Sequence, residues 1–143
     1  MAKPVTAIAE SEADARRCFA LMKQLRPHLA TEDEFVARWK RQVADGYHLM
    51  ILTSGDQPVA LAGYRIQENL VYGRFLYVDD LVSENAARSS GYGSQLMESL
   101  KAQTRRQGCE KLVLDTALTN SLGQRFYFRN GLLATALRFS VTV

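Results

Sequence analysis

Two glycines placed directly before a predicted helix form the feature with the clearest chemical meaning. The segment reads Arg88-Ser89-Ser90-Gly91-Tyr92-Gly93 and continues into Ser94. Glycine lets the backbone approach a ligand closely, and the first turn of a helix presents N–H groups without partners at the positive end of its dipole. This combination predicts a site for phosphate groups where the helix begins.

Two well-known phosphate-binding loops fit this segment poorly. A Walker loop requires Gly-Lys-Ser or Gly-Lys-Thr, whereas this chain has Gly93-Ser94-Gln95. The dinucleotide fingerprint requires a third small residue where Leu96 stands, and its loop follows the strand at once, whereas residues 83–87 intervene here. From the glycines alone, a tight helix start with no ligand remains an open alternative.

Asp79 and Asp80 are adjacent carboxylates within an otherwise apolar strand, predicted over residues 74–82. Strict alternation along that strand would send them to opposite faces of the sheet. A carboxylate in such surroundings is costly unless it is hydrogen-bonded or functional. One of the two, acting through a water molecule, is therefore our candidate general base, and a structural ion pair or a loop cap is the equally open alternative.

The elements before this strand follow from hydrophobic periodicity. Residues 11–25 carry apolar side chains at helical spacing, with Cys18 buried among them, and Pro27 ends that helix. Thr31-Glu32-Asp33-Glu34 has the form of a capping box and predicts a second helix that ends near Gly46. The runs 48–53 and 59–66 predict a hairpin, so the first half is two helices followed by a three-stranded meander.

The second half alternates between helical and strand-like segments. A helix follows Gly93, residues 111–115 predict a buried strand, and Asn120 caps another helix that ends near residues 130–131. Residues 132–143 have strand-like composition. The order ααβββαβαβ predicts an α/β protein with one mixed sheet, in which residues 74–115 form a right-handed parallel crossover.

Around these elements the sequence resembles the GNAT-type N-acetyltransferase superfamily. Residues 75–82 look like the central strand of that family, and Arg88-x-x-Gly91-x-Gly93 looks like its Q/R-x-x-G-x-G/A motif. Downstream, residues 111–115, Asn120 and Phe126-Tyr127 are similar to its next strand and its tyrosine-bearing helix. The resemblance is close over residues 74–133, and the beginning of the chain agrees in layout only.

The resemblance implies a GNAT-like fold with a coenzyme A site in a splayed sheet. Pantetheine would lie between the strands at 76–82 and 111–115, bonded to the main chain of Leu81, Val82 and Ser83. The pyrophosphate would lie on the amides of Arg88, Ser89, Ser90, Gly91, Tyr92, Gly93 and Ser94. Asn120 would lie near the thiol arm of the cofactor.

The same resemblance implies direct attack of an amine on the acetyl thioester, with Tyr127 protonating the departing thiolate. A phenol with a pKa of about 10 is a credible donor to a thiolate whose conjugate acid has a pKa near 8.5. Taken without the resemblance, Phe126-Tyr127-Phe128 is more typical of an aromatic cluster that packs a short helix than of a catalytic group. The need for a base depends on the acceptor, because deprotonation at pH 7 costs about 4.6 kcal/mol for a lysine-like amine and about 1 kcal/mol for an α-amine.

Composition sets the remaining expectations. A chain of 143 residues with 47% hydrophobic and 23% charged residues predicts one domain over residues 1–143. No long apolar run occurs, so we expect no membrane contact, and two cysteines without metal-ligand spacing favour a cytoplasmic protein without a metal. The net charge of +3 is scattered, so nucleic acid is not the expected partner. His28, His48 and Cys109 lack recognisable catalytic partners.

The sequence therefore predicts an enzyme that moves an acetyl group from acetyl-CoA to an amine acceptor. By analogy with other small enzymes of this kind we expect a homodimer, with the terminal strand as a candidate interface. Two rivals stay open: a domain that binds acetyl-CoA as a sensor or complex subunit without transfer, and a nucleic-acid-binding module.

Overall fold

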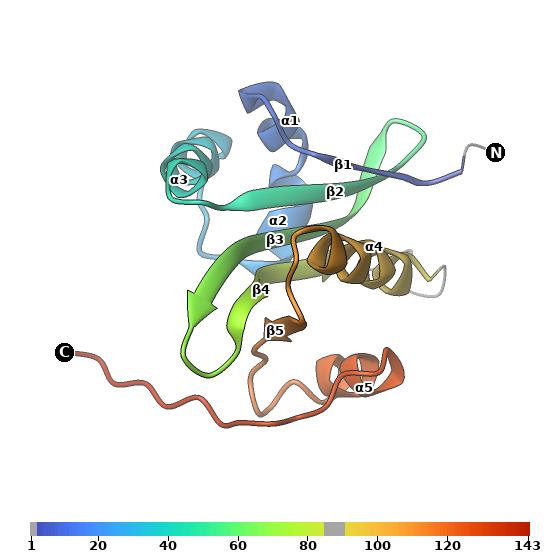
Figure 1. The fold of residues 1–143 in the computed structure, drawn as a ribbon. Coiled ribbons are helices and arrows are strands. Elements are labelled where there is room, and N and C mark those ends of the chain that lie inside the picture. The colour runs from blue at the N-terminus through green and yellow to red at the C-terminus, as the bar shows by residue number, and fades with distance from the viewer. Residues whose placement is uncertain (1–2, 85–90) are drawn as a thin grey trace. The chain divides into compact units, whose positions relative to one another are not determined.

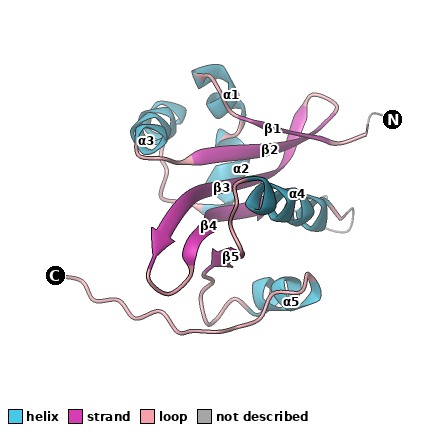
Figure 2. Ribbon diagram, in the orientation of Figure 1, coloured by secondary structure: helices cyan, strands magenta, loops and turns pink. Residues whose placement is uncertain are grey.

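The computed structural model describes residues 3–84 and 91–143, and the chain divides into two compact units, Met1–Val113 and Leu114–Val143. Figure 1 shows the course of the chain and Figure 2 its helices and strands. Each unit is described by itself. The expectation of a single domain over residues 1–143 stays a prediction.

The first unit begins with a strand that the sequence did not predict. Strand β1 (Val5–Ile8) pairs antiparallel with β2 (His48–Ser54). The expected helix over residues 11–25 is two helices, α1 (Glu12–Arg17) and α2 (Phe19–Leu25), which meet at the fully buried Cys18. Helix α3 (Glu32–Ala44) follows, and its N-cap Thr31 accepts from the amide of Glu34 as predicted.

The predicted meander is confirmed as three antiparallel strands. Strand β3 (Gln57–Asn69) pairs with β2 on one side and with β4 (Gly73–Ser83) on the other. The register between β3 and β4 shifts at Gly63/Tyr64: Gly63 lies opposite Asp80 and Tyr64 opposite Val78. Asp79 is therefore the extra residue of a β-bulge.

Helix α4 (Tyr92–Arg106) connects β4 to β5 (Lys111–Leu114), and β5 is next to β4 in the sheet order β1-β2-β3-β4-β5. Three antiparallel pairs followed by this helical crossover confirm the expected mixed α/β sheet. Helices α1–α3 share a core with Leu49, Ile51 and Leu61 on one face of the sheet. Helix α4 contacts β3 and β4. Its buried side chains are those of Leu96, Met97, Leu100 and Thr104.

The second unit contains α5 (Ser121–Arg129) and an extended segment over residues 132–143. The prediction of a strand in that segment is wrong for this chain alone, because its residues have no secondary structure. The side chains of Leu133, Leu137, Phe139, Val141 and Val143 are exposed. A strand exists only when a neighbour supplies hydrogen bonds, and strand-like composition does not provide that neighbour.

Candidate active site

The start of α4 retains the features of an anion site in the part that the structure describes. Gly91 is the N-cap and adopts a left-handed conformation, with φ of 76°, and its Cβ position has no heavy atom within 4 Å. Tyr92, Gly93 and Ser94 are partly exposed, and the first turn carries no acidic residue. Arg88, Ser89 and Ser90 lie outside the described residues. The described half of the motif therefore leaves both space and positive helix potential for an anion.

The end of β4 carries the three residues predicted to bind pantetheine. Leu81, Val82 and Ser83 lie opposite Ala62, Leu61 and Ala60 in the antiparallel pair with β3, and all three are partly exposed. Val82 packs against the core beneath helices α1–α3. In an antiparallel pair, backbone groups alternate between the two edges of a strand, so part of the main chain here points away from β3.

The bulge changes where the two carboxylates point. Asp80 contacts Arg26 and Tyr47, and Asp79 contacts Arg65, whose guanidinium lies 5.4 Å from the centre of the Tyr47 ring. Both carboxylates thus lie on the face that carries Tyr47. The prediction that they occupy opposite faces is wrong, because the extra residue in β4 interrupts the alternation on which it rested.

Asp80 is held through both of its carboxylate oxygens. Its Oδ1 accepts from Nε of Arg26 at 2.9 Å and lies 2.8 Å from Nη2 of that residue, while its Oδ2 accepts from the Tyr47 hydroxyl at 2.8 Å. The Asp80 side chain is only 15% exposed. Burial above all, and then the charge of Asp80, raises the pKa of Tyr47 well above its usual value. Tyr47 therefore stays protonated at neutral pH and donates to Asp80.

Asp79 has a separate cationic partner. Its Oδ2 accepts from Nε of Arg65 at 2.7 Å, and Nη2 of Arg65 donates to Oε1 of Gln42 at 2.8 Å. The hydrogen bond to Asp79 is the leading cause of a raised pKa for Arg65. Two carboxylates and two guanidinium groups thus form one network between β4 and the helices.

Arg26, Tyr47 and Arg65 were not predicted as site residues. Arg26 is the C-cap of α2, Tyr47 precedes β2, and their hydrogen bonds to Asp80 span 54 and 33 residues of sequence. Only the adjacent aspartates in an apolar strand pointed to this network, because buried carboxylates require cationic or hydrogen-bonding partners. The ion-pair alternative for these aspartates describes the contacts that the structure shows, and the base role stays a prediction.

The remaining predicted site residues belong to the second unit. Oδ1 of Asn120 accepts from the amide of Gly123 at 3.1 Å and caps α5 as predicted, and its Nδ2 donates to Oγ1 of Thr116 at 2.9 Å. Tyr127 is half-buried, and its ring lies edge-on to Phe126 at 5.6 Å. Burial raises the pKa of the Tyr127 hydroxyl, which therefore holds its proton at neutral pH as an acid catalyst must.

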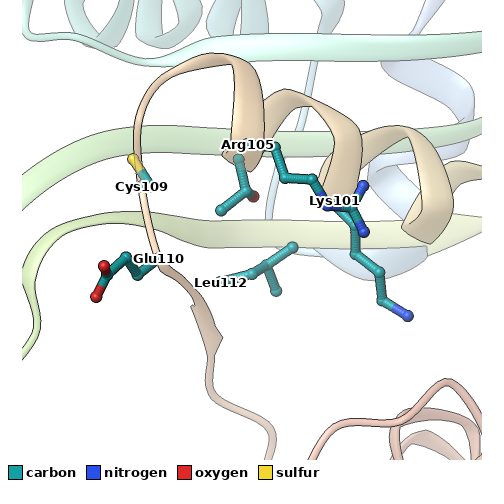
Figure 3. A pocket seen from close by; sticks show the side chains of 6 residues that line it. Lys101, Arg105, Cys109, Glu110 and Leu112 are labelled. Carbon is teal, nitrogen blue, oxygen red and sulfur yellow. The ribbon is translucent and has the colours of Figure 1, made fainter.

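A hollow in the first unit lies away from the predicted site. It lies along the C-terminal half of α4 and the start of β5 (Figure 3), whereas Gly91 is the N-cap of α4. Its lining is Lys101, Thr104, Arg105, Cys109, Glu110 and Leu112. Within residues 3–84 and 91–143, no group of three or more histidine, cysteine, aspartate or glutamate side chains could bind a metal ion. No helix in those residues has the length and apolar character to cross a bilayer.

Comparison with known proteins places this arrangement in a family. The Acetyltransferase (GNAT) family matches residues 10–132. Glucosamine 6-phosphate N-acetyltransferase 1 of Oryza sativa subsp. japonica is 32% identical over 111 residues, which cover 72% of this chain and 67% of the relative. The chain belongs to the GNAT acetyltransferase family, which confirms the resemblance noted in the sequence.

Solved structures support the same fold. The aminoglycoside N-acetyltransferase AAC(6')-Iy in complex with CoA matches with a TM-score of 0.84 and 18% identity, covering 99% of this chain and 97% of that one. A GNAT family acetyltransferase of Staphylococcus aureus subsp. aureus USA300_TCH1516 matches with a TM-score of 0.82 and 17% identity, covering 98% of each chain. These similarities confirm the expected GNAT-like fold.

Proposed function

We propose that this protein transfers an acetyl group from acetyl-CoA to a primary amine of a small molecule or peptide, by direct attack within a ternary complex. The observation that carries the proposal is Gly91. It is the left-handed N-cap of a 15-residue helix, and it follows the β4 end that bears Leu81–Ser83. Both lie within residues 10–132, which match the acetyltransferase family.

Each predicted site residue has a role in binding acetyl-CoA or in proton transfer. The amides from Arg88 to Ser94 hold the pyrophosphate, the main chain of Leu81–Ser83 binds pantetheine between β4 and β5, and Asn120 lies near the thiol arm. The bound acetyl-CoA supplies the activated thioester. Tyr127 gives a proton to the departing thiolate, and Asp79 or Asp80 takes a proton from the amine through water. The phenol of Tyr127 is neutral at pH 7 and therefore carries the proton that the acid role requires.

The relatives suggest which acceptors to test first. Their names include glucosamine 6-phosphate and aminoglycoside N-acetyltransferases. The first test is thiol release from acetyl-CoA with a panel that contains glucosamine 6-phosphate, an aminoglycoside, a polyamine and a peptide amine. Turnover with one of them supports the proposal. Tight binding of coenzyme A with no turnover on any of them supports the sensor instead.

Two variants test the assigned residues. Tyr127→Phe should lower kcat about 100-fold, the lower end of a general acid's contribution, whereas Tyr72→Phe should not. Gly91→Ala should raise KM for acetyl-CoA. Its matched control is Gly55→Ala, because Gly55 also has a positive φ, of 62°, and open space at its Cβ, but lies in the β2–β3 turn. Equal KM values in the two glycine variants would remove Gly91 from the coenzyme site.

We also propose a cytoplasmic homodimer in which residues 132–143 pair with a second copy. Apolar side chains occupy alternate positions of that segment and are exposed, as a strand that lacks its neighbour would present them. The two free, buried cysteines suit a reducing compartment. Light scattering should give twice the chain mass, and Phe139→Lys should shift it to the monomer. A wild-type monomer at micromolar concentration would contradict the dimer.

A further inference from the structure

The network around Asp80 lies at the bulge in β4. Asp80 directly precedes Leu81–Ser83, the main-chain segment assigned to pantetheine, and directly follows the extra residue of the bulge. A bulge bends its strand and increases the local twist, so the groups that fix the bulge also fix the direction of the strand that leaves it. Those groups are Arg26 and Tyr47.

Arg26 holds the bulge from the helical layer. It bonds the Asp80 carboxylate and also donates through Nη2 to the main-chain oxygen of Asp79 at 2.9 Å. One guanidinium therefore binds both the side chain of Asp80 and the backbone of the bulged residue Asp79. Because Arg26 is also the C-cap of α2, it ties the connection between α2 and α3 to the same point of β4.

Tyr47 holds the other oxygen of Asp80, and the sheet is shaped to admit it. A Cβ at Gly63, the residue opposite Asp80, would lie 1.8 Å from the Tyr47 hydroxyl oxygen and 2.3 Å from its ring carbon Cζ. No side chain other than hydrogen fits at that position while Tyr47 keeps its place. Tyr47 is 3% exposed, and its buried hydroxyl donates a hydrogen bond to Asp80.

We propose that Arg26 and Tyr47 are positioning residues for acetyl transfer. They hold Asp80 through both oxygens, fix the bulge at Asp79, and thereby set the main chain of Leu81–Ser83 for the pantetheine arm and the orientation of Asp80 toward the acceptor. This inference rests on the proposed function. Neither residue touches the reacting atoms, and each acts through Asp80.

The test compares variants that differ in their contact with Asp80. Tyr47→Phe removes only the hydroxyl and keeps the ring, and its control is Tyr64→Phe, a buried tyrosine that follows Gly63 in β3 and bonds Gln103 of α4. Arg26→Met removes the guanidinium, and its control is Arg16→Met. Both arginine side chains are 41% exposed, but Arg16 pairs with the exposed Glu32 and Asp33.

Tyr47→Phe and Arg26→Met should each lower kcat/KM for acetyl-CoA about tenfold, the factor that corresponds to one lost charge-assisted hydrogen bond. The Kd of coenzyme A, measured by calorimetry, should rise in the same variants, and Arg26→Lys should recover part of the loss. Both controls should stay within about twofold of wild type. A merely structural role predicts a lower Tm with kcat and Kd unchanged, and that result would overturn the proposal.

Two further measurements keep the outcome decisive. If Arg26→Met does not fold, Arg26→Lys and Tyr47→Phe decide, because both keep the volume at their positions. If wild type binds coenzyme A but acetylates no amine, the proposed function fails and the Kd comparison still judges the positioning role. If it does not bind coenzyme A, hydrogen exchange at Leu81–Ser83 decides: equal rates in Tyr47→Phe and Tyr64→Phe would refute the inference.

Discussion

Two glycines in different regions of the molecule each leave room for a polar side chain. Gly63 in β3 faces the hydroxyl of Tyr47, 1.8 Å from where a Cβ would stand. Gly123 in α5 faces the amide of Asn120, with Nδ2 at 2.3 Å from the corresponding position. Both contacts exclude a methyl group, and both glycines have ordinary φ values rather than positive ones.

The surroundings of the two contacts differ. Tyr47 is 3% exposed and is held by Asp80 and by the Arg65 guanidinium that stacks on its ring, so it cannot move aside. Asn120 is exposed, and its amide is held at the surface by hydrogen bonds with Thr116 and Gly123. The first glycine is thus a packing requirement of the sheet, and the second is a local requirement of one helix cap. A methyl group at each position should separate these two cases.

The largest effect is expected from Gly63→Ala. The added methyl group overlaps the Tyr47 phenol in a fully packed region, and overpacking of this kind costs about 2 to 3 kcal/mol of unfolding free energy. Urea unfolding followed by circular dichroism measures this cost. In a double-mutant cycle with Tyr47→Ala, the double variant should be more stable than the sum of the single effects, because the overlap is gone. Additive effects would show that Tyr47 does not set the constraint.

The contact at Gly63 also marks the limit of what the sequence could predict about the fold. Periodicity predicted β2 to β5 and helices α3 to α5, because each has its own repeating apolar pattern. It missed β1, and it missed the break at Cys18, which no glycine or proline marks. It also missed the bulge, since an extra residue in a strand is a property of the pair and not of either sequence.

The candidate site divides in the same way. Asp79, Asp80 and Gly91 were found because their types are unusual for their local positions. Arg26 and Tyr47 were not found, because an arginine after a helix and a tyrosine before a strand are ordinary locally. Their significance comes from partners far along the chain, which only the folded structure brings together.

A smaller effect is expected from Asn120→Ala. The variant removes the oxygen that accepts from the amide of Gly123, and losing such a cap costs about 1 kcal/mol. Hydrogen exchange measures this locally: amides of residues 121–129 should exchange about fivefold faster. Thr31→Ala removes the corresponding cap of α3 and should speed exchange there while leaving α5 unchanged. Unchanged exchange in α5 would mean that the cap is not needed for the helix.

The smallest net effect is expected from Gly123→Ala, because two changes of similar size oppose each other. Alanine within a helix is favoured over glycine by about 1 kcal/mol, and displacing Asn120 from its cap costs about the same. Exchange in α5 should therefore stay near the wild-type rate, while acetyl transfer falls if Asn120 lies near the thiol arm. In the Asn120→Ala background the methyl group displaces nothing, so there Gly123→Ala should recover about 1 kcal/mol. If Gly123→Ala also stabilises the wild-type protein by about 1 kcal/mol, Asn120 must move aside without cost. Gly123, unlike Gly63, would then not be required to make space for a neighbouring side chain.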